Sequence, residues 1–202
     1  MNTIQMSRQR QMAILSSLNK LGFMTRSQIQ RLHNLGSDRN ACRVLANMKE
    51  YLNSFRLEEN VFYLNKKGRE MVGSTKKVTR TAQVRHILMR NELYLYYGCP
   101  KAWNVEKEVL INGKAYIKPD VIFMIDNRLY FAEIDHTQTM SNNKRKIEKY
   151  AELKELGAFQ RQYGYFPLLI WLTTNDAKRQ LLQKACDDKG IETFILTLDE
   201  VK

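Results

Sequence analysis

The sequence lacks long hydrophobic runs, and it has little cysteine. No stretch approaches the roughly 18 consecutive apolar residues of a membrane-spanning helix. The first residues, MNTIQMSRQRQ, lack the apolar segment of a secretory signal peptide. Cys42, Cys99 and Cys186 stand far apart, without CxxC spacing or a neighbouring histidine pair, which excludes a disulfide framework and a zinc site and favours reduced thiols. Together these absences predict a cytoplasmic protein with no membrane partner.

Acidic residues are scarce near the start of the chain. Residues 1–80 contain 15 Lys and Arg against 5 Asp and Glu, whereas residues 81–202 contain 18 against 16. The formal charge of +12 is therefore concentrated in the first segment. A basic surplus confined to one segment is typical of a module that binds phosphates of DNA. The alternative is a basic surface that is merely solvated.

The spacing of apolar residues predicts three helices in residues 1–75. The first runs from an N-cap at Ser7 to Leu21, with Gly22 ending it, and the second begins at a capping Thr25. The third begins near Ser37, and its apolar positions recur at i, i+3, i+4 and i+7. This recurrence leaves the following polar residues on the outer face of the third helix: Arg39, Asn40, Arg43, Asn47 and Lys49.

A hairpin follows, with strands at 52–57 and 61–64 around Glu58-Glu59-Asn60, and a short helix starts near Lys66. Three helices and a hairpin in this order are the arrangement of a winged helix-turn-helix. Arg and Asn on the last helix of such a trio can read base edges and phosphates in the major groove of DNA. We therefore predict DNA contacts from Arg39, Asn40, Arg43 and Asn47, with Lys66, Lys67 and Arg69 holding phosphates beside the wing. A winged helix used only to dock a protein is the alternative.

The rest of the chain alternates strands and helices. Residues 76–100 start as a basic linker and continue as a connecting helix that Gly98 and Pro100 end. Beyond it, Asn112-Gly113 and Asp126-Asn127 are strong turn signals between strands. The segments predicted after the connecting helix are strands at 102–111, 115–125 and 128–135, a helix at 142–157 with Ile147, Tyr150, Leu153 and Leu156 inward, a strand at 166–174, a helix at 175–190 and a strand at 191–198. This order predicts a small α/β sheet with helices packed on it.

Carboxylates gather in this sheet. Asp120 lies in one predicted strand, and Glu133 and Asp135 stand two residues apart on the next, so the last two side chains share a face. Hard oxygen ligands of this kind can hold Mg²⁺ or Mn²⁺. Two residues of the preceding strand could add a ligand, Glu106 and Glu108. The alternative is that these carboxylates are solvated or paired with the lysine-rich helix at 144–149.

Two segments, KPDVIFMIDNRLYFAEIDHTQTM and KRKIEKYAEL, resemble the core of the PD-(D/E)xK nucleases. Joined to an N-terminal winged helix, the chain looks like the replication-relaxation family of plasmids and other mobile elements. The matching elements are Pro119-Asp120, Glu133-Ile134-Asp135, Thr137 to Thr139 and Lys146 to Tyr150. The resemblance implies an α+β fold, with a winged helix-turn-helix in residues 1–75, a connecting helix in residues 76–100 and a small α/β restriction-endonuclease-like domain in residues 101–202.

One position departs from the nuclease pattern. The pattern places a lysine two residues after Glu133, and this chain has Asp135 there, which adds negative charge where negative charge develops in the reaction. Lys144, Lys146 or Lys149 on the following helix could reach back and replace that lysine. This departure favours a nuclease-like fold retained for binding. The candidate catalytic residues are Asp120, Glu133, Asp135 and Lys146, and the candidate metal ligands are Asp120, Glu133 and Asp135.

The resemblance implies a sequence-specific DNA-binding accessory protein of a plasmid or other mobile element, acting in replication, DNA relaxation for transfer or regulation of those genes. Its expected partners are double-stranded DNA, plasmid replication or transfer proteins, and a second copy in a homodimer. Two alternatives stay open. One is a metal-dependent endonuclease targeted by its winged helix and using Mg²⁺ or Mn²⁺. The other is a transcriptional regulator with a C-terminal sensing or dimerisation domain.

Overall fold

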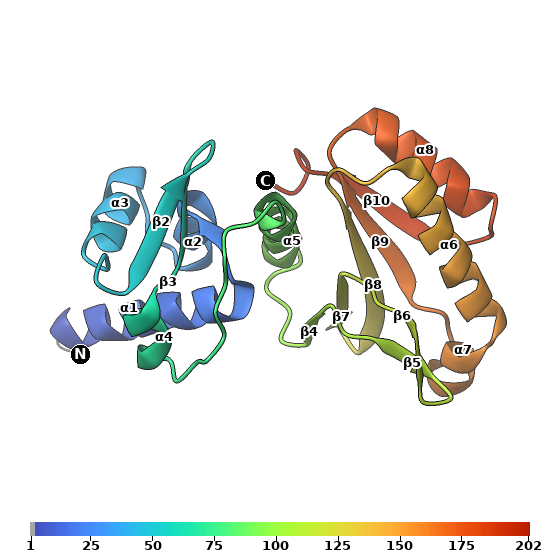
Figure 1. The fold of residues 1–202 in the computed structure, drawn as a ribbon, viewed down its shortest axis with the longest axis horizontal. Helices are drawn as coiled ribbons and strands as arrows, with labels where there is room; N and C mark the ends of the chain where they lie inside the picture. Colours follow the sequence, from blue (N-terminus) through green and yellow to red (C-terminus); the bar gives the residue numbers. More distant parts are fainter. Residues whose placement is uncertain (1–2) are drawn as a thin grey trace. The chain divides into compact units, whose positions relative to one another are not determined.

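A computed structural model describes residues 3–202 of the chain. The chain divides into two compact units, Met1–Asn91 (unit 1) and Glu92–Lys202 (unit 2), and the division falls inside helix α5, Val84–Tyr96 (Figure 1). Helices and strands occur in both units, so the predicted α+β class is confirmed. No helix among the described residues is both long and apolar enough to cross a membrane.

Unit 1 has the predicted order of helix, helix, helix and hairpin. Its elements within residues 3–83 are α1 (Thr3–Leu21), β1 (Met24–Thr25), α2 (Arg26–Leu32), α3 (Asp38–Ala46), β2 (Leu52–Arg56), β3 (Asn60–Leu64) and α4 (Lys66–Met71). The strands form one antiparallel sheet in the order β1-β3-β2. Strand β1 was not predicted, because its two residues are too few to show an alternating pattern. The N-cap predicted at Ser7 is wrong, since Ser7 lies inside α1.

Local caps determine where the next two helices of unit 1 begin. Thr25 accepts a hydrogen bond from the backbone of Gln28 at 3.2 Å, and the Gln28 side chain accepts one from the Thr25 backbone at 3.1 Å, which is a capping box. Ser37 caps α3 in the same way by accepting from the Asn40 backbone at 3.3 Å. Gly22 follows α1 with a φ of +85°, as its predicted place after the helix requires.

Gly68 lets α4 pack closely on the segment that follows α3. A Cβ atom at this position would lie 2.2 Å from the backbone oxygen of Tyr51. We expect Gly68→Ala to lower the free energy of unfolding of unit 1 by about 1–3 kcal/mol or more, because the backbone oxygen cannot move aside without shifting the helix. Urea denaturation followed by circular dichroism measures this loss. Glu70→Ala on the exposed side of α4 is the control, and equal stability of the two variants would contradict the prediction.

Unit 2 contains a five-stranded mixed sheet in the order β10-β9-β8-β7-β4. A separate two-stranded hairpin is formed by β5 and β6. Helices α6 and α8 cover one face of the sheet (Figure 1). The elements after α5 are β4 (Trp103–Val105), β5 (Val109–Ile111), β6 (Lys114–Ile117), β7 (Val121–Ile125), β8 (Arg128–Asp135), α6 (Met140–Glu155), α7 (Ala158–Tyr163), β9 (Leu168–Thr173), α8 (Asp176–Asp187) and β10 (Thr193–Thr197). Helix α7 was not predicted.

The two long strands predicted at 102–111 and 115–125 are each broken into two. Glu106 has a φ of +50°, which ends β4, and residues 118–120 interrupt the second strand before β7. As a result β4 pairs with β7 in the main sheet, whereas β5 and β6 form the separate hairpin around Asn112-Gly113. The prediction that Asp120 lies in a strand is therefore wrong, because it immediately precedes β7.

The predicted carboxylates of β8 lie on the face of the sheet that the helices cover. The Asp126-Asn127 turn, with φ values of +47° and +60°, sets the β7–β8 register, in which Val121 is opposite Ala132. Phe131 on this strand packs with Ile147, Tyr150 and Leu153 of α6, so Glu133 and Asp135, two and four residues further on, face the same helices. Of the residues predicted to point inward from α6, Leu156 does not, because it is 43% exposed.

Candidate functional site

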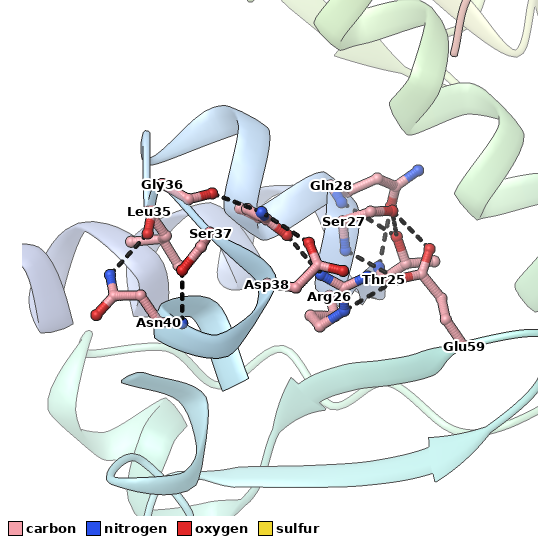
Figure 2. A network of polar contacts seen from close by, with 11 residues as sticks. Thr25, Arg26, Ser27, Gln28, Leu35, Gly36, Ser37, Asp38, Asn40 and Glu59 are labelled. Atoms are coloured by element: carbon pink, nitrogen blue, oxygen red, sulfur yellow. Dashed lines mark hydrogen bonds and ion pairs between the residues drawn. The ribbon is translucent and has the colours of Figure 1, made fainter. Parts of the chain in front are cut away.

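The outer face of α3 presents most of the residues predicted to contact DNA. Arg39, Arg43 and Asn47 are exposed, and Asn47 is also the C-cap residue of the helix. Asn40 is half-buried, and its amide donates a hydrogen bond to the backbone oxygen of Leu35 at 2.6 Å (Figure 2). The Asn40 side-chain oxygen accepts from Arg43 at 2.7 Å. Asn40 therefore braces the turn before α3 and orients Arg43, while the other three residues point to solvent.

The three basic residues of α4 lie at the base of the hairpin. Leu64, which precedes α4, pairs with Leu52 at the end of the hairpin opposite its tip. Lys66 and Lys67 are exposed, and the Lys67 ammonium lies 2.8 Å from the carboxylate of Glu50. A further α4 residue, Arg69, is half-buried and donates to the backbone oxygen of Leu64 at 3.4 Å. These residues form a second basic cluster, beyond the C-terminal end of α3.

A polar network joins α2, the start of α3 and the tip of the hairpin (Figure 2). Arg26 lies 2.9 Å from a carboxylate oxygen of Asp38, which also accepts from Gln30 at 3.0 Å. Hydrogen bonds from Gln30 and Arg26 lower the pKa of Asp38. The Glu59 carboxylate accepts from the backbone of Ser27 at 2.9 Å and from its hydroxyl at 2.5 Å. This network, which sequence reasoning missed, fixes α3 and the hairpin relative to α2.

In unit 2, Asp120 and Glu133 meet at a lysine of α6. The Lys146 ammonium contacts one oxygen of Glu133 and lies 3.9 Å from an oxygen of Asp120. The hydroxyl of Tyr150, one turn along α6, donates to the other oxygen of Glu133 at 2.5 Å. Asp120 also accepts from the backbone of Ile134 at 2.8 Å. Three of the four candidate catalytic residues, Asp120, Glu133 and Lys146, are therefore brought together.

Burial dominates the electrostatics of this cluster. Glu133 is 1% exposed, and burial raises its pKa to about 8, although Lys146 and the hydroxyl of Tyr150 act in the opposite direction. Burial alone would lower the pKa of Lys146, but the charges of Glu133 and Asp120 outweigh it and raise that pKa. Burial also raises the pKa of Tyr150 well above its ordinary value. The cluster is thus a buried ionisable site with one cation between two carboxyl groups.

Asp135 shares the face of Glu133 but has a different partner. One of its oxygens lies 3.0 Å from the ammonium of Lys178 in α8, and the other accepts from the Thr173 hydroxyl at 3.4 Å. Lys178 also donates to the backbone oxygen of Gln138 at 3.3 Å. Asp135 is fully buried. Sequence reasoning did not single out Lys178, which follows Asp135 by 43 residues, and no spacing in the sequence marks this pair.

The arrangement of these carboxylates does not fit a divalent metal ion. The Lys146 ammonium contacts Glu133 and lies near Asp120, and Asp135 is held by Lys178, so each of these carboxyl groups already faces an ammonium. No group of three His, Cys, Asp or Glu side chains in the described part of the chain is placed to hold a metal ion. Of the two further candidates, Glu106 pairs with Lys118 at 3.2 Å on the surface and Glu108 is exposed.

Comparison with known proteins identifies the family. No curated protein and no solved structure matches the chain. The model of the replication-relaxation family matches residues 15–169, which include all of α2 to α7 and most of the sheet of unit 2. Membership of this family points to a role in the replication or relaxation of a plasmid or other mobile element. Because the match covers more than half of its length, the chain belongs to the replication-relaxation family.

Proposed function

We propose that the chain is a sequence-specific accessory protein that binds double-stranded DNA during replication or relaxation of a plasmid or other mobile element. The observation that carries this proposal is the outer face of α3, where Arg39, Arg43 and Asn47 are exposed on a helix capped at Ser37. This helix belongs to the segment that holds 15 Lys and Arg against 5 Asp and Glu. Family membership supports the same process.

In this proposal unit 1 is a winged helix-turn-helix, with α3 in the major groove and the β2–β3 hairpin as the wing. The tip of the hairpin is acidic and bound within unit 1, since Glu59 contacts Ser27 and Glu58 pairs with Arg85 at 2.5 Å. The tip therefore positions α3 and leaves phosphate contacts to α3 itself and to α4, through Lys66, Lys67 and Arg69. A homodimer on paired half-sites and contacts with replication or transfer proteins complete the proposal.

Arg43 is the residue with which we would test this function. We expect Arg43→Ala to weaken binding to the preferred duplex by about 1–3 kcal/mol and to relax the preference for one base pair, because a bidentate contact to a base edge is lost. The duplex is the one that the wild-type protein selects from a random library, and affinity is measured by fluorescence anisotropy. The matched control is Arg10→Ala, which removes the same charge from an exposed position of α1. Equal weakening in the two variants would rule out base recognition by α3.

A metal-dependent endonuclease is the second candidate function. One observation favours it, because Lys146 of α6 reaches Glu133 and Asp120 and could stand in for the lysine that Asp135 replaces. Against it, no group of three His, Cys, Asp or Glu side chains in the described residues is placed to hold a metal ion. The test is incubation with supercoiled plasmid in Mn²⁺, beside the Asp120→Ala/Glu133→Ala variant. We expect retarded but intact DNA with both proteins, and nicking by the wild type alone would make the protein a nuclease.

A further inference from the structure

A pocket of about 280 Å³ opens beside Lys146 in unit 2. It lies between the β5–β6 hairpin and α6, and it is distinct from the outer face of α3 in unit 1. Its lining residues are Glu108, Ala115, Tyr116, Ile117, Lys118, Lys146 and Lys149. The lining thus includes three lysines and one glutamate, and the lysines come from α6 and from the segment directly after β6.

The three lysines differ in how firmly they are held. Lys146 is 22% exposed and is held by Glu133, with Asp120 at 3.9 Å. Lys149 is exposed one turn away on α6. Lys118 pairs with Glu106 at 3.2 Å, but both side chains are about half exposed, so water screens this pair and Lys118 can turn towards another anion at little cost. The pocket is therefore lined by one lysine that is held in place and by two exposed lysines that can move.

The charge behind the pocket does not prevent an anion from entering. Asp120 is not among the lining residues, and its carboxylate also accepts from the Ile134 backbone. Glu133 is 1% exposed and is enclosed by Lys146 and Tyr150. The one carboxylate of the lining is that of Glu108, and three lysines of the same lining outnumber it.

We infer that this pocket of unit 2 binds a phosphate group through Lys118, Lys146 and Lys149 without a metal ion. The Lys146 ammonium supplies the positive charge that a divalent cation would otherwise bring next to Asp120 and Glu133. The ligand is the phosphodiester of a DNA backbone or a free phosphate, which present the same oxygens to the pocket. The DNA source rests on the proposed function, whereas the binding of a phosphate group does not.

The first arm of the test uses inorganic phosphate and the full-length protein in EDTA. We expect saturable broadening of the phosphate ³¹P NMR signal by the wild type, and loss of this broadening in Lys118→Ala/Lys149→Ala. Both replaced lysines are exposed, so the fold should survive, and circular dichroism checks it. The matched control is Lys184→Ala/Lys202→Ala, which removes the same charge from exposed lysines of unit 2 outside the pocket. Equal broadening by the two variants would overturn the inference, as would a requirement for Mg²⁺.

The second arm identifies the source of the phosphate. Binding of a random-sequence duplex is measured in EDTA over a range of KCl concentrations. If the ligand is a DNA backbone, the log–log slope for Lys118→Ala/Lys149→Ala becomes less steep by about 1–2, because each lost phosphate contact contributes about 0.9. An unchanged slope with lost ³¹P broadening assigns the pocket to a free phosphate. A further outcome is that Arg43→Ala weakens DNA binding while Lys118→Ala/Lys149→Ala changes neither the ³¹P broadening nor the salt slope. That outcome would support the proposed DNA function and overturn the inference about the pocket.

Discussion

Replacing Lys178 by methionine is expected to lower the free energy of unfolding of unit 2 by about 3–5 kcal/mol. Asp135 is fully buried, and the Lys178 ammonium at 3.0 Å is the cation that faces it. Methionine keeps the length of the side chain but leaves the carboxylate with the Thr173 hydroxyl at 3.4 Å, and a neutral hydroxyl at that distance cannot offset the lost charge. The cost is therefore that of an uncompensated buried charge.

Tryptophan fluorescence isolates this effect, because both tryptophans of the chain, Trp103 and Trp171, lie in unit 2. The urea midpoint at an unchanged m-value gives the loss of stability. Lys184→Met, on the exposed side of the same helix, should change the free energy of unfolding of unit 2 by less than about 0.5 kcal/mol. The double variant Asp135→Asn/Lys178→Met should recover most of the loss, since no charge remains buried. A double variant as unstable as Lys178→Met would show that the side-chain volume, and not the charge, matters there.

The sequence predicted unit 1 well because its signals are local. Thr25, Ser37 and Asn65 each cap a helix by bonding a backbone amide three residues later, so every cap can be recognised within one turn. The network that fixes α3 could not be found in this way. Glu59 reaches Ser27 across 32 residues, and only the pairing of β3 with β1 brings the hairpin tip to the start of α2.

The predicted strands of unit 2 failed where two signals conflicted. Residues 115–125 are apolar enough to be read as one strand, but Pro119 within them lacks the amide that a central strand would need. The break before β7 lies at this proline, and it is also what puts Asp120 at the strand end, beside Ile134. Proline was thus the available signal that Asp120 is not inside a strand.

The spacing of the buried residues of α6 could have shown which of its three candidate lysines reaches Glu133. Asn143, Ile147, Tyr150 and Leu153 are the buried residues of α6. Lys146 stands three residues after the first of them and four before Tyr150, so it shares their face, whereas Lys144 and Lys149 are exposed. The pairing of Asp135 with Lys178 had no such signal, because it depends on how α8 crosses the parallel strands β8 and β9.

Replacing Lys146 by methionine is expected to destabilise unit 2 by an amount that grows with pH. In the folded protein burial raises the pKa of Glu133 to about 8 from an ordinary value of 4.5. A carboxyl group whose pKa is raised by folding contributes stability that is fully present below the ordinary pKa and is lost as the pH rises through the folded value. Lys146 limits this loss because its charge favours the ionised form of Glu133. Without Lys146 the pKa of Glu133 rises further, so the folded protein holds this proton to a higher pH and loses more stability as the pH rises.

The difference in unfolding free energy between wild type and Lys146→Met should therefore be small near about pH 5, where Glu133 is protonated in both folded proteins. It should reach about 1 kcal/mol near about pH 9, just above the pKa of about 8 that Glu133 has in the wild type. Urea denaturation followed by tryptophan fluorescence at several pH values measures it. Lys149→Met, an exposed neighbour on α6, should show no such trend. Adding Glu133→Gln to Lys146→Met should remove the pH dependence, because no carboxyl group is left to ionise there. A loss that is the same at every pH would mean that Lys146 stabilises the fold by packing, and that ionisation of Glu133 does not control the stability of unit 2.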